Sequence, residues 1–168
     1  MTIERDAIAR LKASQSWLIT VESCTGGLLA HRLTQVAGAS EVFWGGMVTY
    51  HNSAKELLTK VPRELLIRHG AVSAEVAGAL AEGGLHLLSD TMQSTGNESP
   101  GACLSTTGID GPGGGSLEKP VGLCYIGVAM SGMPTVVHEL RAAAGLTREE
   151  YKNIFADTAL NQLINQLP

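Results

Sequence analysis

Ser23 and the residues after it carry the first pattern with possible chemistry. Ser23 lies in the segment ESCTGG at 22–27, between a short apolar run and a helical pattern, so it is expected where a helix begins. Free backbone N–H groups at a helix N-terminus would stabilise a serine alkoxide or a tetrahedral oxyanion. Gly26 and Gly27 would let an oxyanion approach the main chain closely. The alternative interpretation is that Ser23 or Thr25 only caps the helix.

Lys55 is the second candidate. Ser53 and Glu56 have capping-box spacing, which predicts a helix that begins at Ser53 and places Lys55 in its first turn. A positive charge there opposes the helix dipole, and partial burial would lower the lysine pKa further, so the neutral amine can act as a general base. Tyr50, at the end of the preceding predicted strand, can donate a hydrogen bond from its hydroxyl or relay a proton. The alternatives are a solvated surface lysine and a tyrosine that only packs.

The segment GIDGPGGG at 108–115 has five glycines in eight residues, more than a hairpin turn requires. Successive backbone N–H groups in such a loop can form a nest that binds phosphate. The segment matches neither the P-loop nor the dinucleotide-binding pattern, and the alternative is a long structural connection. Arg148, beside a predicted cap at Thr147, can reach an anion above the sheet, although a single arginine is more commonly a solvated charge.

The apolar patterns around these residues predict alternating helices and strands. Helices are predicted at 3–11, 28–36, 62–69 and 73–88, from Ser53, and after a capping box at Thr147 and Glu150; strands are predicted at 17–21, 47–50, 102–107, 121–130 and 135–141. The polar segment 89–101 is predicted to be a mobile surface loop. The SGMP turn at 131–134 predicts an antiparallel pair added to βα units, hence an α/β fold with a mixed sheet covered by helices on both faces.

Length and composition limit the class of protein. The 168 residues suit one domain over 1–168 with an aliphatic core. A net charge of −4 with only 12 dispersed Lys and Arg residues argues against a nucleic-acid partner. The N-terminal stretch lacks the apolar core of an export signal, and the longest apolar run is too short for a bilayer. We therefore expect a soluble, unexported protein with no membrane partner.

The cysteine and histidine residues suggest a compartment and argue against a metal site. Three cysteines are an odd number without close spacing, which suits a reducing cytoplasm. The five histidines form no paired-ligand pattern, so we expect no metal. Charged residues make up only 17% of the chain, and the predicted helix at 73–88 is rich in alanine, which fits self-association as a homo-oligomer.

Taken together, six features resemble the CinA C-terminal domain family. They occur in order over nearly the whole chain and are highly specific in combination: ESCTGG at 22–27, YxNxxK at 50–55, HGAVS at 69–73, TGIxGPGGG at 107–115, EKPVG at 118–122, and Arg148. The resemblance implies a three-layer α/β/α sandwich with a mixed, mainly parallel sheet. Some family members have an additional N-terminal pyrophosphatase-type domain, and we expect no room for one here.

The resemblance also implies an activity. Members that act as nicotinamide-nucleotide amidohydrolases convert nicotinamide mononucleotide to nicotinate mononucleotide and ammonia, without metal or cofactor. It implies Ser23 as the nucleophile and Lys55 and Tyr50 as its acid-base partners. The residues expected to contact a small-molecule nucleotide substrate are Thr25, Gly26, Gly27, Asn52, Thr107, Gly108, Gly111, Gly113, Gly114 and Arg148.

Asp110 departs from the family pattern, which usually has alanine there. A carboxylate inside a loop that is expected to hold phosphate is electrostatically adverse. We therefore expect the Asp110 side chain to point away from the phosphate, held outward by its own backbone or by a neighbouring cation.

A non-catalytic nucleotide-binding or assembly module is the competing hypothesis. The same helix N-termini and glycine loop would then hold a phosphate without turnover. The pair formed by Ser23 and Lys55 separates the two hypotheses, because simple binding does not need it.

Overall fold

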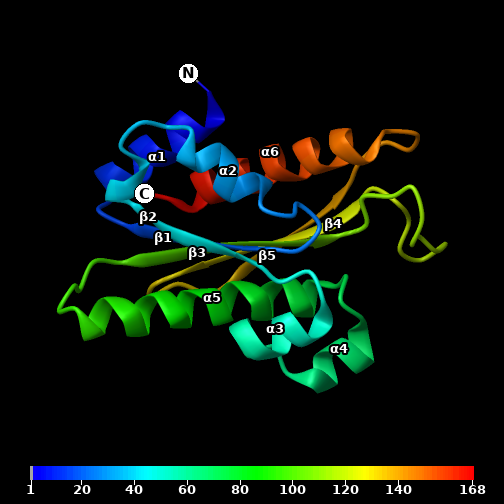
Figure 1. The fold of residues 1–168 in the computed structure, drawn as a ribbon, viewed down its shortest axis with the longest axis horizontal. Coiled ribbons are helices and arrows are strands. Elements are labelled where there is room, and N and C mark those ends of the chain that lie inside the picture. Colours follow the sequence, from blue (N-terminus) through cyan, green and yellow to red (C-terminus); the bar gives the residue numbers. More distant parts are fainter. Residues whose placement is uncertain (1) are drawn as a thin grey trace.

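The computed structural model describes residues 2–168 and contains a five-stranded sheet between two layers of helices (Figure 1). The elements are α1 (Ile3–Ala13), β1 (Trp17–Glu22), α2 (Leu28–Thr34), the 3₁₀ helix η1 (Ala39–Glu41), β2 (Phe43–Val48), α3 (Asn52–Thr59), α4 (Arg63–His69), α5 (Ala74–Ser94), β3 (Gly101–Gly108), β4 (Leu123–Met130), β5 (Val136–Arg141) and α6 (Arg148–Gln166). The α/β class and the mixed sheet predicted from the sequence are confirmed.

The direction of the strands determines where a site can form. The strand order is β2-β1-β3-β4-β5, with β1 parallel to β2 and β3, and β4 antiparallel to β3 and β5. Strands β1, β2, β3 and β5 therefore run in the same direction, and their carboxyl ends lie at one edge of the sheet. In open α/β sheets, ligands bind at that edge.

Each face of the sheet has its own apolar core. Helices α1, α2 and α6 cover one face, and the long α5 with α3 and α4 covers the other (Figure 1). Side chains alternate along β3: Ala102 and Leu104 pack in the core beneath α1 and α6, whereas Cys103 packs in the core beneath α5. A strand buried on both faces reads as a continuous apolar run, and β1 and β4 do so in this sequence.

The predicted surface loop at 89–101 is wrong in its first part, because α5 continues to Ser94. Leu88 and Met92 are four residues apart, so both lie on the buried face of the helix. Between them Asp90 is exposed and Ser89 and Thr91 are half-buried, and this polar run hides the helical period in the sequence.

The predicted strand at 47–50 is also displaced, since β2 spans Phe43–Val48. Gly45 and Gly46 interrupt the apolar pattern of this edge strand. A Cβ at Gly46 would lie 2.3 Å from Thr20 Oγ1, so glycine lets β2 pack closely on β1.

Helix α3 begins at Asn52, one residue before the predicted start. Its cap is His51, whose Nδ1 accepts a hydrogen bond from the Ser53 backbone N–H at 3.2 Å. The predicted capping box at Ser53 and Glu56 is therefore wrong, although the helix itself is present. Lys55 is the fourth residue of α3.

Two further predictions are confirmed. Thr147 and Glu150 form the capping box of α6: Thr147 Oγ1 accepts from the Glu150 N–H at 3.2 Å, and Glu150 Oε2 accepts from the Thr147 N–H at 2.7 Å. The turn at 131–134 joins β4 and β5 as an antiparallel pair. Within residues 2–168, none of the helices is both long and apolar enough to cross a membrane.

Candidate active site

Ser23 and Lys55 meet at the carboxyl edge of the sheet. Ser23 is the first residue after β1, and Lys55 lies on α3, the helix that follows the neighbouring parallel strand β2. The distance from Lys55 Nζ to Ser23 Oγ is 3.0 Å, within hydrogen-bond range. Ser23 is 8% exposed and Lys55 only 1% exposed. The structure thus brings together the nucleophile and the base that the sequence predicts.

The Lys55 amine has three polar neighbours. Besides Ser23 Oγ, it donates to the backbone carbonyl oxygens of Thr49 at 2.6 Å and Tyr50 at 3.2 Å. A neutral amine has two N–H donors and one lone pair. When both carbonyls accept from the two donors, the lone pair is left for the Ser23 hydroxyl proton. This geometry suits a general base.

Burial lowers the pKa of Lys55 from 10.5 to about 8. The cause is desolvation, which disfavours the ammonium form. The sequence predicts a lowered pKa from the helix dipole, with partial burial as a second cause. In the structure burial is the larger cause, because the amine is almost fully buried. The helix dipole is the smaller one, because α3 begins at Asn52, three residues before Lys55.

Glu22 is the site residue that the sequence reasoning missed. It ends β1 and is only 1% exposed. Its carboxylate accepts hydrogen bonds from five donors: Thr25 Oγ1 at 2.8 Å, Thr20 Oγ1 at 3.5 Å, the Leu29 N–H at 3.0 Å, and the Gly27 and Ala30 N–H groups at 2.9 Å each. A negative charge beside a helix N-terminus is stabilised by the free N–H groups and the helix dipole. Glu22 therefore caps α2 and fixes the turn that presents Ser23.

The backbone N–H groups near Gly26 and Gly27, where an oxyanion is expected to approach, differ in whether they already have an acceptor. The Gly27 N–H already donates to the capping carboxylate, and the Gly26 N–H donates to the Ser23 carbonyl at 3.2 Å. Within residues 2–168, the N–H groups of Cys24 and Thr25 donate to no protein acceptor. These two groups directly follow Ser23, the predicted nucleophile, and are available to donate to an oxyanion.

Replacing Glu22 with glutamine is expected to lower the free energy of unfolding by about 3 kcal/mol, because a buried amide puts an N–H group against N–H donors and removes the charge at the helix end. Urea denaturation at pH 7 measures the change. Glu82→Gln, at an exposed position in the middle of α5, is the matched control and should stay within about 0.5 kcal/mol of wild type. A Glu22→Gln variant as stable as this control would contradict the capping role.

The Tyr50 hydroxyl belongs to a second cluster around Arg148, and its role as a proton relay stays a prediction. Its hydroxyl accepts a hydrogen bond from Arg148 Nη2 at 2.8 Å, and this is the hydroxyl's only hydrogen bond within residues 2–168. Arg148 Nη1 donates to the Gly111 carbonyl at 2.6 Å. The hydrogen bond between Lys55 and Tyr50 is to the Tyr50 backbone carbonyl, and Lys55 Nζ reaches Ser23 Oγ directly, so proton transfer between Ser23 and Lys55 has a direct route.

Asp110 is held by a neighbouring cation, one of the two arrangements expected from the sequence, and its direction relative to a bound phosphate stays a prediction. Its side chain is only 7% exposed, and Oδ1 pairs with Arg148 Nη2 at 3.1 Å. A neighbouring cation does hold the carboxylate, but it holds it in the interior. Arg148 is the residue that the resemblance implies as a nucleotide contact. Its positive charge is already compensated by the Asp110 carboxylate.

Two threonines predicted to contact substrate have protein partners. Thr25 Oγ1 bonds to Thr106 Oγ1 at 2.8 Å as well as to the Glu22 carboxylate. Thr107 Oγ1 donates to the Ala71 carbonyl at 2.7 Å, which ties β3 to the turn before α5. These hydroxyls support the site by fixing the backbone, and their contact with substrate stays a prediction.

The remaining predicted contacts lie on the rim of the same edge. Gly108 ends β3, where a Cβ would lie 2.7 Å from a backbone oxygen of β4. Gly113 and Gly114 are exposed in the loop that follows, and Asn52 is exposed at the start of α3. The Gly111 carbonyl accepts the hydrogen bond from Arg148 Nη1. Contact between these residues and substrate stays a prediction.

One cavity adjoins the predicted site residues. This cavity, of about 370 Å³, is lined by Thr25, Gly26 and Gly27 together with His31 and Lys152, so it adjoins the turn that follows Ser23. Lys152 was missed in the sequence, although its spacing of four residues from Arg148 on α6 places both on one helix face.

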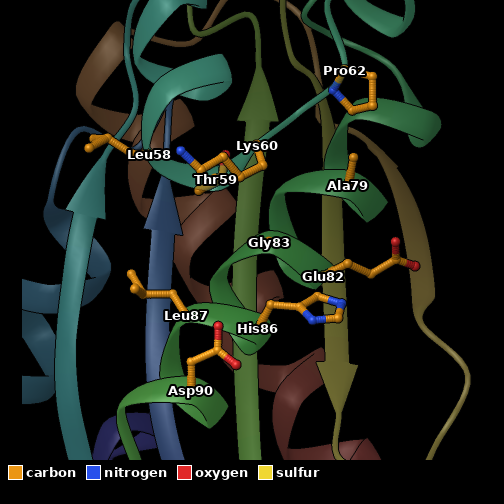
Figure 2. Close-up of a pocket in the computed structure, with 10 residues that line it drawn as sticks. All are labelled: Leu58, Thr59, Lys60, Pro62, Ala79, Glu82, Gly83, His86, Leu87 and Asp90. Atoms are coloured by element: carbon orange, nitrogen blue, oxygen red, sulfur yellow. The ribbon is translucent and has the colours of Figure 1, made fainter.

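The second cavity, of about 400 Å³, lies between the end of α3 and α5 (Figure 2). Glu82, His86 and Asp90 border it at successive turns of α5, with Lys60 on the opposite side. None of the predicted site residues lines this cavity. We assign it no part in the active site.

The family follows from comparison with known proteins. The family model described as the CinA C-terminal domain matches residues 1–167. The chain belongs to the CinA C-terminal domain family. This membership confirms the resemblance carried by the motifs at 22–27, 50–55 and 107–115.

Two relatives show how the chain compares in length. A CinA-like protein from Geobacter sulfurreducens is 42% identical over 162 residues, which are 96% of this chain and 36% of that protein. Another from Chlorobium chlorochromatii is 44% identical over 161 residues, which are 94% of this chain and 35% of that protein. The chain therefore spans about a third of the length of these curated relatives.

Solved structures of the family share the fold over nearly their whole length. The competence/damage inducible protein CihA from Agrobacterium tumefaciens is 37% identical with a TM-score of 0.85, covering 98% of this chain and 96% of that one. A CinA superfamily protein from Escherichia coli is 30% identical with a TM-score of 0.83, covering 99% and 91%.

Proposed function

We propose that this protein is a nicotinamide-nucleotide amidohydrolase that converts nicotinamide mononucleotide to nicotinate mononucleotide and ammonia. The observation that carries the proposal is the buried pair of Ser23 and Lys55, with Nζ 3.0 Å from Oγ and the amine pKa lowered to about 8. A serine nucleophile needs an adjacent base that is neutral near the working pH. Membership of the family and the retained motifs add support.

In the first half-reaction, the neutral Lys55 amine takes the Ser23 hydroxyl proton as Oγ attacks the carboxamide carbon of the nicotinamide. The tetrahedral oxyanion accepts hydrogen bonds from the N–H groups of Cys24 and Thr25, which follow the nucleophile. The Lys55 ammonium then gives its proton to the leaving nitrogen. The C–N bond breaks, ammonia leaves, and an acyl ester forms on Ser23.

In the second half-reaction, water attacks the acyl ester and Lys55 takes its proton. Collapse of the second tetrahedral intermediate returns the proton to Ser23 Oγ and releases the carboxylate product. Lys55 therefore acts alternately as base and acid, and the overall reaction consumes one water. No cofactor is needed for this sequence of steps.

The direct test is incubation of the purified protein with nicotinamide mononucleotide. Ammonia and nicotinate mononucleotide should form in equal amounts and in proportion to enzyme concentration. Nucleotide binding with no ammonia release would favour the alternative, a non-catalytic nucleotide-binding or assembly module of the same fold.

The dependence of the rate on pH follows from the Lys55 pKa. Because the neutral amine is the reactive form, kcat/KM should fall about tenfold per pH unit well below pH 8 and level off above it. Initial rates of ammonia release from pH 6 to 9.5 measure this profile. A rate that is constant between pH 6 and 8 would remove Lys55 as the base.

A further inference from the structure

The Asp110 carboxylate has one oxygen without a partner. Oδ1 is held by Arg148 Nη2 at 3.1 Å, whereas Oδ2 is buried and accepts no hydrogen bond from the protein. Within residues 2–168, it is the one buried side-chain nitrogen or oxygen atom in this condition. A buried carboxylate oxygen without a donor is costly, so its retention calls for a reason.

A chain of contacts joins Asp110 to the nucleophile. Lys55 Nζ contacts both Ser23 Oγ and the Tyr50 carbonyl, the Tyr50 hydroxyl accepts from Arg148, and Arg148 pairs with Asp110. Both ends of the chain also leave adjacent parallel strands, β1 and β3, at the same edge of the sheet. Asp110 thus lies beside the proposed active site.

The orientation of the carboxylate is set from two directions. Arg148 holds Oδ1 and is itself held by the Gly111 carbonyl at 2.6 Å and by the Tyr50 hydroxyl at 2.8 Å. The guanidinium therefore cannot turn to cover Oδ2 without giving up one of these bonds. The positive charge of Arg148 is compensated by the Asp110 carboxylate. This part of the site is therefore suited to a ligand group that donates a hydrogen bond and carries no charge.

We propose that Asp110 binds a ribose hydroxyl of the substrate, with Oδ2 as acceptor and Arg148 as the residue that positions it. A carboxylate oxygen needs an N–H or O–H donor, and the hydroxyls of a ribose are the donors that a nucleotide offers away from its reacting carboxamide. Carboxylates recognise ribose hydroxyls in other nucleotide sites for the same reason. The inference rests on the proposed function only in taking a nucleotide as ligand.

The test measures binding, so it does not depend on turnover. In a Ser23→Ala background, calorimetry gives dissociation constants for nicotinamide mononucleotide and for its 2′-deoxy and 3′-deoxy analogues. One of the two analogues should bind at least tenfold more weakly than the parent compound, about 1.4 kcal/mol. Adding Asp110→Ala should reduce this ratio to less than threefold. A ratio unchanged by Asp110→Ala, or no ribose preference in the background variant, would overturn the proposal.

The controls separate ribose recognition from general damage. Asp157 is a carboxylate that pairs with Arg32 at 2.7 Å elsewhere on the surface, so Asp157→Asn should leave the tenfold ratio intact. A melting curve confirms that the Asp110 variant is folded. If wild type releases no ammonia but the ribose ratio behaves as expected, the amidohydrolase proposal fails and this inference stands. If neither the parent nucleotide nor its analogues bind at millimolar concentration, the inference fails.

Discussion

Replacing Ser23 with alanine is expected to lower ammonia release from nicotinamide mononucleotide by at least about a thousandfold, because the variant has no nucleophile to form the acyl intermediate. The fold should be retained, since Glu22 rather than Ser23 caps α2 by accepting from the Gly27, Leu29 and Ala30 N–H groups. Within residues 2–168, the Ser23 hydroxyl bonds to one side chain, that of Lys55. Steady-state rates and a thermal melt measure the two effects.

Ser40→Ala is the matched control for that variant. Ser40 is an exposed serine in η1, and its replacement should leave both rate and melting temperature unchanged. A folded Ser23→Ala protein that keeps more than a tenth of the wild-type rate would remove Ser23 from the chemistry.

Replacing Lys55 with methionine should lower the rate by about 100- to 10,000-fold, the range for losing a general base. The variant also has a stability signature. The Lys55 pKa is about 8 in the folded protein against 10.5 for an ordinary lysine, so between these pH values the unfolded chain binds more protons. Wild-type stability should therefore rise by about 3 kcal/mol relative to the variant from about pH 7.5 to about pH 10.5. Urea denaturation at several pH values measures this difference.

Lys60→Met supplies the comparison for the lysine experiment. Lys60 is exposed at the end of the same helix, and its stability difference from wild type should not change over that pH range. Parallel pH curves for wild type and Lys55→Met would show that the Lys55 amine is not held neutral by burial.

The fit between sequence and structure is best where the signal is local. The capping box at Thr147 and Glu150, the turn at 131–134 and the apolar run of β1 depend on residues close together in the chain, and the sequence predicts all three. The nearness of Ser23 and Lys55 is implied by the resemblance to the CinA family, and the structure explains it, because both follow parallel strands and so lie at one edge of the sheet. The sequence gives the helix dipole as the main cause of the low Lys55 pKa, whereas the structure gives burial. The depth of that burial depends on packing between distant segments, which the sequence does not show.

The errors concern partners that are distant or unusual. The role of Glu22 requires a turn that brings the N–H groups of α2 back to the end of β1. Only the folded backbone reveals which N–H groups near Gly26 and Gly27 already have protein acceptors. The cation that holds Asp110 is not identified from the sequence, because its partner Arg148 lies 38 residues further along the chain. Long-range ion pairs of this kind leave no periodic signal in a sequence.

The most direct test of acyl transfer at Ser23 is interception of the acyl-serine with hydroxylamine. Wild type turning over nicotinamide mononucleotide in hydroxylamine should form the hydroxamate of nicotinate mononucleotide at the expense of the acid, while ammonia release continues. The hydroxamate fraction should rise with hydroxylamine concentration, and mass spectrometry quantifies both products. Ammonia release with the acid as the sole product at every hydroxylamine concentration would contradict a covalent intermediate and the mechanism built on Ser23.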